Sequence, residues 1–324
     1  MAAEVAENRK LIRDPELRQI YGEALESMIL GGMKIKALDG DLMRAVGTWE
    51  LWKKYPEHFI ECGIAEANMV GLAAGLSAEG FIPFVHSFGA FASRRAYDQI
   101  FMSCAYAGLN VKIIGSDPGV IAALNGGTHT ANEDMAAMRV LPGVRLVDMT
   151  DAVMARDLLP KIAADYGTYY VRYPRCSMPR VYGDGVSFEV GKAKILRGGN
   201  DLTIIASGAE VSEALDAADI LKRQGISARV IDMFTVKPLD EAAVIGAARE
   251  TGAIVTAENA NRNGGLHDAV ASCTARYAPV PVECVANQDR FGDVGSVEYL
   301  MKEYELTAEQ IAEKAQAVFR RKLR

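Results

Sequence analysis

A single acidic side chain at the start of an apolar helix is the first residue in this sequence that could do chemistry. Glu66 lies in the segment Gly63-Ile64-Ala65-Glu66-Ala67-Asn68-Met69, and the apolar pattern predicts a helix over 64–78. A carboxylate in the first turn of a helix can simply be favoured by the helix dipole. A buried carboxyl group at that position can also share a proton with a ligand. The segment alone leaves both interpretations open.

Three further segments carry aromatic, imidazole and guanidinium groups. They are Ser87–Gln99, Asn125–Thr130 and Arg172–Arg175. Helical spacing predicts that Phe91 and Arg94 share one face, with Phe88 leading into it. His129 stands on a glycine-containing loop, where an imidazole can act as an acid or a base. Ordinary core packing for the phenylalanines and a structural hydrogen bond for the histidine are the alternatives.

As a set, the four segments resemble the transketolase family in order and spacing. From about Arg18 to its end, the chain resembles the pyrimidine-binding domain of that family followed by its C-terminal domain. The resemblance implies thiamine diphosphate as cofactor and the transfer of a two-carbon ketol unit from a ketose to an aldose. It also implies that the chain is the C-terminal subunit of a split, two-chain transketolase.

The resemblance gives the cofactor-binding residues their roles. Glu66 becomes the catalytic carboxyl group that shares a proton with the pyrimidine ring of the cofactor, which is itself the base in this chemistry. Phe88 and Phe91 are expected to pack on that ring, while Arg94 stands where several relatives carry Tyr. Asp41 follows a predicted strand and is expected to approach the thiazolium side of the cofactor. A turn-forming role for Asp41 is the alternative.

The sugar-binding residues that the resemblance implies are Arg18, Asn125, His129 and Arg175. His129 matches the family histidine that hydrogen-bonds the sugar and moves protons on its hydroxyl groups. Two arginines suit bidentate contacts to a phosphate. However, Ala45 replaces the family serine, Asp117 replaces the family histidine and Asn125 replaces the usual acidic residue. Because Asp117 would oppose a phosphate, we expect a phosphorylated or otherwise anionic sugar with an unusual binding mode.

One family motif is missing from this sequence. Transketolases of full length carry Gly-Asp-Gly followed by paired asparagines that hold the metal on the diphosphate, whereas Gly183–Gly185 has no such pair after it. A divalent cation needs several oxygen ligands. The resemblance therefore implies that Mg²⁺ or another divalent cation, and the diphosphate, are held by a separate N-terminal subunit, with no metal ligand on this chain. Paired sites of this kind predict a heterotetramer.

Two other functions stay open. The beta subunit of a 2-oxo acid dehydrogenase decarboxylase has the same size, the same two domains and the same glutamate. A catalytically silent assembly subunit could also keep the fold. Lipoamide-linked decarboxylation would distinguish the first, and the effect of Glu66→Gln would distinguish the second.

Short apolar runs that alternate with helical patterns predict an α/β protein with two doubly wound, mostly parallel sheet domains. Strands are expected near 33–38, 59–62, 81–86, 111–115, 144–148, 168–173, 202–206, 228–232, 253–257 and 281–285. Helices in the first half are expected near 15–30, 64–78, 91–107, 132–140 and 152–165.

A Pro- and Gly-rich stretch after Tyr173 predicts a domain boundary. The expected domains are a pyrimidine-binding domain over 1–185 and a transketolase C-terminal domain over 186–324. The segments 235–240 and 258–266 resemble the family's C-terminal domain, and we assign them to subunit association. Loops and helix caps are the alternative for both segments.

Composition narrows the class of protein. The chain has 324 residues and a net charge of −6, which argues against a nucleic-acid surface. Its five cysteines are far apart and predict reduced thiols in a cytoplasmic protein. The first ten residues are polar and charged, unlike a signal peptide, and no apolar run has the length of a membrane span.

Overall fold

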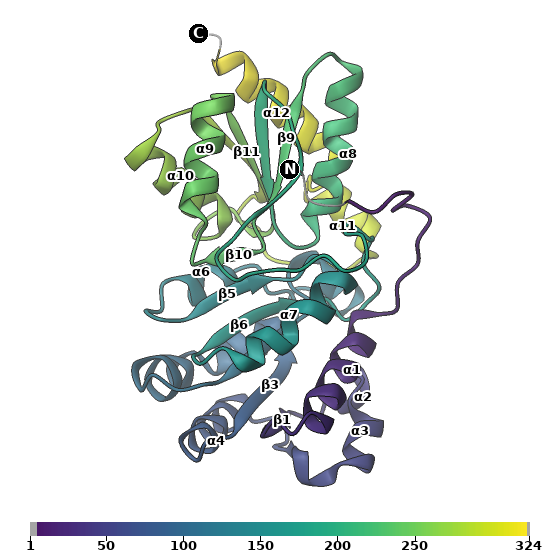
Figure 1. Ribbon diagram of the computed structural model, residues 1–324, viewed down its shortest axis with the longest axis vertical. Helices are drawn as coiled ribbons and strands as arrows, with labels where there is room; N and C mark the ends of the chain where they lie inside the picture. The colour runs from purple at the N-terminus through teal and green to yellow at the C-terminus, as the bar shows by residue number, and fades with distance from the viewer. Residues whose placement is uncertain (1–4, 323–324) are drawn as a thin grey trace.

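Two mostly parallel sheets form the framework of the protein. In the computed structural model, which describes residues 5–322, helices cover both sheets (Figure 1). The first sheet has the order β10-β5-β6-β4-β3-β1-β2 and the second has the order β12-β11-β8-β9-β7. β10 runs antiparallel to β5 and β7 runs antiparallel to β9, whereas the other pairs are parallel. The predicted fold class is confirmed.

The strands of the first sheet are β1 (Ile35–Asp39), β2 (Phe59–Glu61), β3 (Ile82–Phe88), β4 (Lys112–Ser116), β5 (Arg145–Asp148), β6 (Tyr169–Tyr173) and β10 (Thr235–Lys237). Those of the second are β7 (Lys194–Arg197), β8 (Leu202–Ala206), β9 (Ala228–Asp232), β11 (Ile254–Asn261) and β12 (Val282–Asn287). Every residue of β4, β6 and β8 is buried. Such continuous burial is typical of parallel strands that are covered on both faces, and it explains their mostly apolar sequence.

The α-helices are α1 (Leu17–Leu30), α2 (Met43–Val46), α3 (Trp49–Lys54), α4 (Glu66–Ala78), α5 (Tyr97–Gln99), α6 (Asp134–Arg139), α7 (Ala152–Ala164), α8 (Glu210–Arg223), α9 (Glu241–Thr251), α10 (Leu266–Tyr277), α11 (Val297–Glu303) and α12 (Ala308–Lys322). The 3₁₀ segments are η1 (Pro56–His58) and η4 (Gly119–Asn125), and the π-helical segments are η2 (Phe91–Arg95) and η3 (Ile100–Tyr106). In β3, Phe84 packs in a cluster with α1 and α7, and its neighbour Val85 packs in a second cluster with α4. The two faces of the sheet therefore bury separate layers.

The local structure differs from the sequence expectations at three places. The helix expected over 91–107 is divided into η2, α5 and η3, because Ala96 leaves helical geometry at φ −118° and ψ 13° and the Ser93 hydroxyl donates to the Gly89 carbonyl at 2.6 Å. The helix expected from Ile64 begins at Glu66. Thr235–Lys237, for which a loop or cap was the alternative, forms β10 and extends the first sheet across β5.

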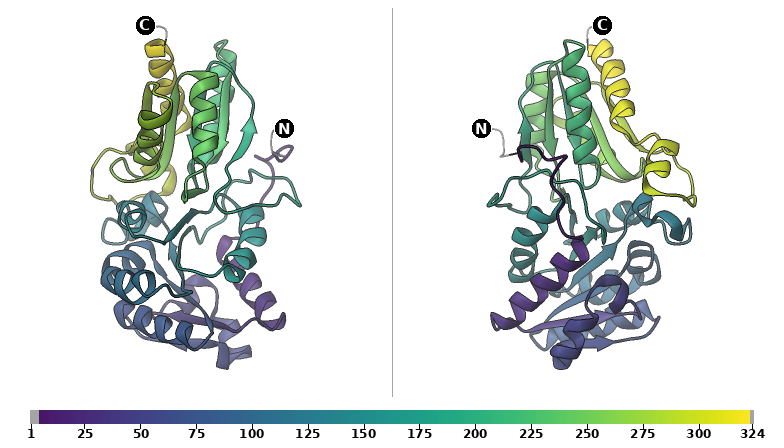
Figure 2. Two further views of the ribbon diagram at one scale, coloured as in Figure 1. Left: turned by 60° about the vertical axis from the view of Figure 1, so that its left-hand side comes forward. Right: turned by 90° about the vertical axis from the view of Figure 1, so that its right-hand side faces the viewer.

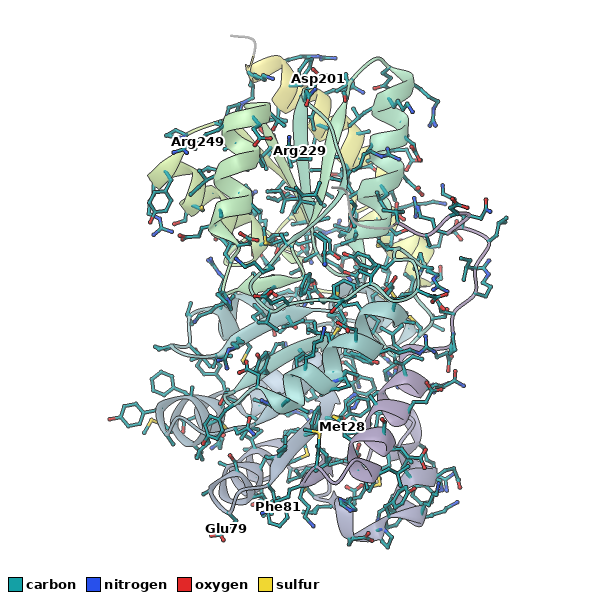
Figure 3. The ribbon with its side chains drawn as sticks, viewed as in Figure 1. Met28, Glu79, Phe81, Asp201, Arg229 and Arg249 are labelled. Atoms are coloured by element: carbon teal, nitrogen blue, oxygen red, sulfur yellow. The ribbon has the colours of Figure 1, made fainter. Side chains whose placement is uncertain are left out.

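The carboxyl edges of both sheets face the junction between the two halves of the chain. Figure 3 places Phe81, just before β3, at the lower end of the molecule, and Asp201, just before β8, at the upper end. Both strands therefore run from the ends of the molecule toward its middle, as the turned views of Figure 2 also show. In open parallel sheets, ligands bind outside the carboxyl ends of the strands.

A buried hydrogen-bond network joins the two halves at this junction. The Arg172 guanidinium of β6 pairs with Asp134 at 3.0 Å and with Asp148 at 3.1 Å, and it donates to the Asn259 carbonyl of β11 at 2.7 Å. The Ser207 hydroxyl, which follows β8, donates to Asp148 at 2.8 Å. The second half of the chain thus holds the carboxyl edge of the first sheet in place.

Candidate cofactor and sugar site

Glu66 begins α4 at the carboxyl edge of the first sheet. Gly63 turns the chain with φ +67°, and Ala65 caps the helix with non-helical torsion angles. The Glu66 side chain is 5% exposed. Its Oε1 lies 3.0 Å from Nη1 of Arg95, which belongs to η2. A nearly buried carboxylate therefore lies beside a cationic donor at the predicted cofactor position.

Three of the predicted residues form one aromatic cluster. Phe88 ends β3, Phe91 begins η2, and their ring centroids lie 6.0 Å apart. The His129 ring lies 5.5 Å from that of Phe88 and 5.0 Å from that of Phe91, edge-on to both. Such edge-to-face packing is favourable for aromatic rings. The structure thus brings His129 against two phenylalanines from a distant segment of the sequence.

The loop that carries His129 is held by the second half of the chain. Gly126 has φ +73°, and a Cβ atom added to Gly127 would collide with the Gly292 carbonyl oxygen. Only a glycine allows so close an approach of two backbones. The Thr128 hydroxyl and Nδ1 of His129 are 2.9 Å apart and hydrogen-bonded. This contact orients the imidazole ring through Nδ1 and does not involve Nε2.

A cavity of about 320 Å³ brings together the predicted anion-binding residues. Its lining includes Arg18, Asp117, Asn125 and Arg175. Both arginines donate to the Ala45 carbonyl, Arg18 at 3.5 Å and Arg175 at 3.4 Å. Each is also paired with a carboxylate, because Arg175 lies 2.6 Å from Asp117 and Arg18 lies 2.6 Å from Glu16.

The two parts of the candidate site are adjacent. The Arg175 guanidinium carbon lies 4.5 Å from the centroid of the Phe88 ring. Phe88 therefore contacts His129 on the cofactor side and Arg175 on the anion side. A ligand with an anionic end in the cavity could reach the imidazole ring with its other end.

Two further predicted cofactor residues have partners of their own. Arg94 pairs with Glu133 at 3.0 Å and donates to the Thr128 carbonyl at 3.3 Å, so its side chain supports the His129 loop. Asp41 is exposed, has φ +64°, and donates its backbone N–H to Glu61 at 2.8 Å. The same Glu61 oxygen accepts from Gly63 at 2.9 Å, which ties the Asp41 turn to the start of α4.

Arg95 is the residue of this site that sequence reasoning missed. Its guanidinium carbon lies 3.8 Å from the centroid of the Phe91 ring, and it also pairs with Glu66. Spacing of three residues along an ideal α-helix favoured Arg94. In η2 the residue four positions after Phe91 lies over its ring, a spacing that an α-helix also places on the same face. The signal for Arg95 in the sequence was its position directly after Arg94.

A buried polar cluster lies behind the anion cavity. His86 of β3 is the register partner of Asp39 of β1, and its ring packs edge-on against Tyr21 at 4.8 Å. Neither ring nitrogen of His86, nor the Tyr21 hydroxyl, has a hydrogen-bond partner within the described part of the protein. Burial, together with the charge of Arg175, lowers the pKa of His86 to about 3. Burial raises the pKa of Asp39 to about 7.

We expect His86→Phe to make the protein less sensitive to acid. The unfolded histidine takes up its proton near pH 6.5, whereas the folded one does so near pH 3, so the wild type loses stability as the pH falls between these values. The difference in unfolding free energy between the variant and the wild type should grow by about 1.4 kcal/mol per pH unit below 6.5. Urea unfolding at several pH values measures it. A difference that does not change with pH would show that burial and the charge of Arg175 do not keep His86 neutral.

Two family models cover most of the chain. The model described as transketolase, pyrimidine binding domain matches residues 13–180, and the model described as transketolase, C-terminal domain matches residues 191–311. The chain belongs to the transketolase family. Within it, the chain is similar over nearly its full length to proteins that are named as subunits.

Two curated relatives carry the word subunit in their names. The chain is 47% identical over 306 residues to 6-deoxy-6-sulfo-D-fructose transketolase subunit SqwH of Clostridium sp. (strain MSTE9), covering 94% of this chain and 95% of the relative. It is 37% identical over 300 residues to an apulose-4-phosphate transketolase subunit of Phocaeicola vulgatus, covering 92% of this chain and 96% of the relative.

Solved structures agree with this relationship. A structure titled split gene transketolase, inactive beta4 tetramer superimposes with a TM-score of 0.88 at 39% identity, covering 94% of this chain and 99% of that chain. The transketolase of Campylobacter jejuni has the same fold, with a TM-score of 0.78 at 18% identity, and this chain covers 47% of it. The chain is therefore similar to a split transketolase subunit, as predicted from its motifs.

Two further observations concern residues 5–322 alone. None of the helices in that range is both long and apolar enough to cross a membrane. Within the same range, His, Cys, Asp and Glu side chains do not gather in groups of three or more that could hold a metal ion.

Proposed function

We propose that this chain is the pyrimidine-side subunit of a two-chain transketolase. It would transfer a two-carbon ketol unit from an anionic ketose to an aldose, with thiamine diphosphate held jointly with a separate N-terminal subunit. The observation that carries this proposal is the convergence of Glu66, Phe88, Phe91 and His129 beside a cavity lined by two arginines. Membership of the transketolase family supports the same reaction type.

The residues present fit the pyrimidine end of the cofactor. Glu66 offers a nearly buried carboxylate, and Phe88 and Phe91 offer apolar ring surface on which a flat heteroaromatic ring can pack. When bound, thiamine diphosphate supplies the carbanion and the electron sink that carbon–carbon bond cleavage needs. Glu66 would hold a proton at the pyrimidine nitrogen that faces it. The two phenylalanines would orient the ring and exclude water from it.

His129 would move protons on the sugar. Its ring packs on both phenylalanines, and the Thr128 hydroxyl holds Nδ1 at 2.9 Å. An imidazole fixed in this way can accept a proton from a sugar hydroxyl and return it. Asn125, on the same loop, would contact the sugar. Arg94, beside that loop, would contact the cofactor.

The proposal includes a partner chain. The relatives that this chain covers almost completely are named as subunits, and the Campylobacter enzyme is about twice as long. The missing diphosphate-binding half, with Mg²⁺ or another divalent cation, would come from an N-terminal subunit. A heterotetramer of two such pairs would give two cofactor sites in a closed twofold assembly.

The charges in the cavity favour a monoanionic sugar such as a sulfonate. Arg175 is paired with Asp117 and Arg18 is paired with Glu16, so the two cations are already balanced by two carboxylates. A sulfonate carries one negative charge, whereas a phosphate ester carries nearly two at neutral pH. Adding the second charge beside Asp117 is unfavourable. The relative named for 6-deoxy-6-sulfo-D-fructose supports the same choice.

We therefore expect Asp117→Asn to change the preference between donors. In the reconstituted complex, the kcat/KM ratio for D-fructose 6-phosphate over 6-deoxy-6-sulfo-D-fructose should rise about tenfold, since the neutral amide would leave Arg175 free to balance a second charge. Steady-state kinetics with each ketose and one aldose acceptor measures the ratio.

Asp219→Asn is the matched control, because Asp219 also pairs with an arginine, Arg197, at 2.7 Å but lies on α8 of the second half. That variant should leave the ratio unchanged. An unchanged ratio in Asp117→Asn would contradict the role of Asp117 in donor selection. Lipoamide-linked decarboxylation by the complex would replace the whole proposal with a dehydrogenase subunit.

A further inference from the structure

We propose that Arg95 guards the cofactor site by occupying the place of the pyrimidine ring, and that the cofactor must displace it to bind. This inference rests on the proposed function, because it takes Glu66 and Phe91 as the pyrimidine contacts. Arg95 has no role in the reaction described above.

Arg95 makes the two contacts that the pyrimidine ring is expected to make. Its Nη1 lies 3.0 Å from Oε1 of Glu66, and its guanidinium carbon lies 3.8 Å from the centroid of the Phe91 ring. A guanidinium is flat, stacks on aromatic faces and donates hydrogen bonds in its own plane. An aminopyrimidine is also flat, stacks on aromatic rings and forms in-plane hydrogen bonds to a carboxyl group. The two groups therefore compete for the same surfaces.

The charge of Glu66 explains why a cation is favourable at this position. Glu66 is nearly buried and forms its ion pair with Arg95. A buried carboxylate without a partner is strongly unfavourable. Arg95 therefore balances Glu66 in the chain alone. After displacement, the pyrimidine ring would take over the hydrogen bond to Glu66.

Arg95 is also able to move. Its side chain is 48% exposed, and it ends η2 directly before Ala96, where the helical geometry breaks. Because the Arg95 side chain is half-exposed, salt screens its pair with Glu66 in part. The side chain can thus swing toward solvent without disturbing the buried layers. Only molecules in which Arg95 has moved away from Glu66 and Phe91 can bind the cofactor. The apparent affinity is therefore reduced in proportion to the fraction of such molecules.

The test is the affinity of the reconstituted complex for thiamine diphosphate at a fixed, saturating Mg²⁺ concentration, measured by titration calorimetry. We expect Arg95→Ala to bind the cofactor roughly five- to tenfold more tightly than the wild type. Added salt screens the Arg95–Glu66 pair, so this ratio should shrink as NaCl increases from low to high concentration. Arg156→Ala is the matched control, since its side chain is 46% exposed and pairs loosely with Glu23 on another face.

Each other result has a defined meaning. Equal or weaker binding by Arg95→Ala would overturn the inference, and weaker binding would make Arg95 a cofactor-binding residue. If Arg95→Ala does not fold, Arg95→Lys keeps the charge but loses the flat stacking group, and it should bind the cofactor more tightly than the wild type by a smaller factor. If the wild-type complex itself does not bind thiamine diphosphate, the proposed function has failed, not the role of Arg95.

Discussion

Replacing Glu66 by Gln is expected to lower the kcat of the reconstituted complex by about 10²- to 10⁴-fold, the range typical of a lost proton-transfer group. Gln has nearly the same shape and can still form a hydrogen bond, but it cannot hold a shared proton at the pyrimidine nitrogen. Removal of the negative charge also frees Arg95 from its partner. We therefore expect cofactor binding to survive while turnover is lost. Ketol transfer and calorimetric cofactor binding, measured on the same preparation, separate the two effects.

Glu79→Gln provides the control for this variant. Glu79 is exposed and caps the opposite end of the same helix, as its position at the lower end of Figure 3 shows. That substitution changes the net charge equally and should leave kcat unchanged. Wild-type turnover in Glu66→Gln would contradict the catalytic role and would favour the silent assembly subunit.

The second large effect is expected on stability. Arg172→Met would leave Asp134 and Asp148 buried at the junction without their cation, and breaking such a buried pair destabilises a protein by about 3–5 kcal/mol. Arg172 also donates to the Asn259 carbonyl, so the variant should weaken the attachment of the second half of the chain. Equilibrium unfolding in guanidinium chloride measures the loss.

The loss should depend on pH. Burial raises the pKa of Asp148, and the Arg172 charge opposes that rise. Without Arg172 the folded protein would keep a proton on Asp148 at a higher pH than the unfolded chain does. The stability of the variant relative to the wild type should therefore decrease as the pH rises above the ordinary range of an aspartate.

Arg229→Met is the comparison for this experiment. Arg229 lies at the start of β9, near the far end of the second sheet (Figure 3), and pairs with the exposed Glu250 at 2.6 Å. Such a pair contributes about 0–1 kcal/mol. A loss in Arg172→Met no larger than that of Arg229→Met would show that the junction network does not hold the two halves together.

Much of the fold could be predicted because parallel, covered strands have a strong sequence pattern. β4, β6 and β8 are buried at every residue, and their apolar runs predicted them to within a residue. β10 was missed because three residues before a proline carry no periodicity, and because its partner β5 lies about ninety positions earlier in the chain. Short strands that pair at long range are decided by tertiary contacts rather than by local preference.

The candidate site, like the fold, was predicted only in part. Glu66, Phe88, Phe91 and His129 were predicted from their types and order as site residues. The structure brings the three rings into one cluster, and Arg95 links Glu66 to it. Arg95 was missed because residues three and four positions after Phe91 both share its face, and the contact was assigned to Arg94 alone. The Asp117–Arg175 pair was predicted only as a conflict of charge, because the sequence does not say that the two side chains neutralise each other.

The polar groups behind the cavity could not be predicted either. His86 and Tyr21 belong to segments with ordinary apolar patterns, and their burial without partners follows from the packing of β3 against α1. A pattern of residues shows which side chains face the core, but not which polar atoms remain without a hydrogen bond there.

The central claim is that two chains share one ketol-transferring site, and its most direct test is activity after separation and recombination. The tagged chain, purified from its native host, and the partner that accompanies it are assayed alone and together. The assay contains thiamine diphosphate, Mg²⁺, 6-deoxy-6-sulfo-D-fructose and D-glyceraldehyde 3-phosphate. Cleavage between carbons 2 and 3 of the donor should release a four-carbon sulfonated aldose and lengthen the acceptor by two carbons, and it should occur only in the mixture. Activity of this chain alone, a lipoyl-bearing acyltransferase as the partner, or a mixture that transfers no ketol unit from any ketose would contradict the claim.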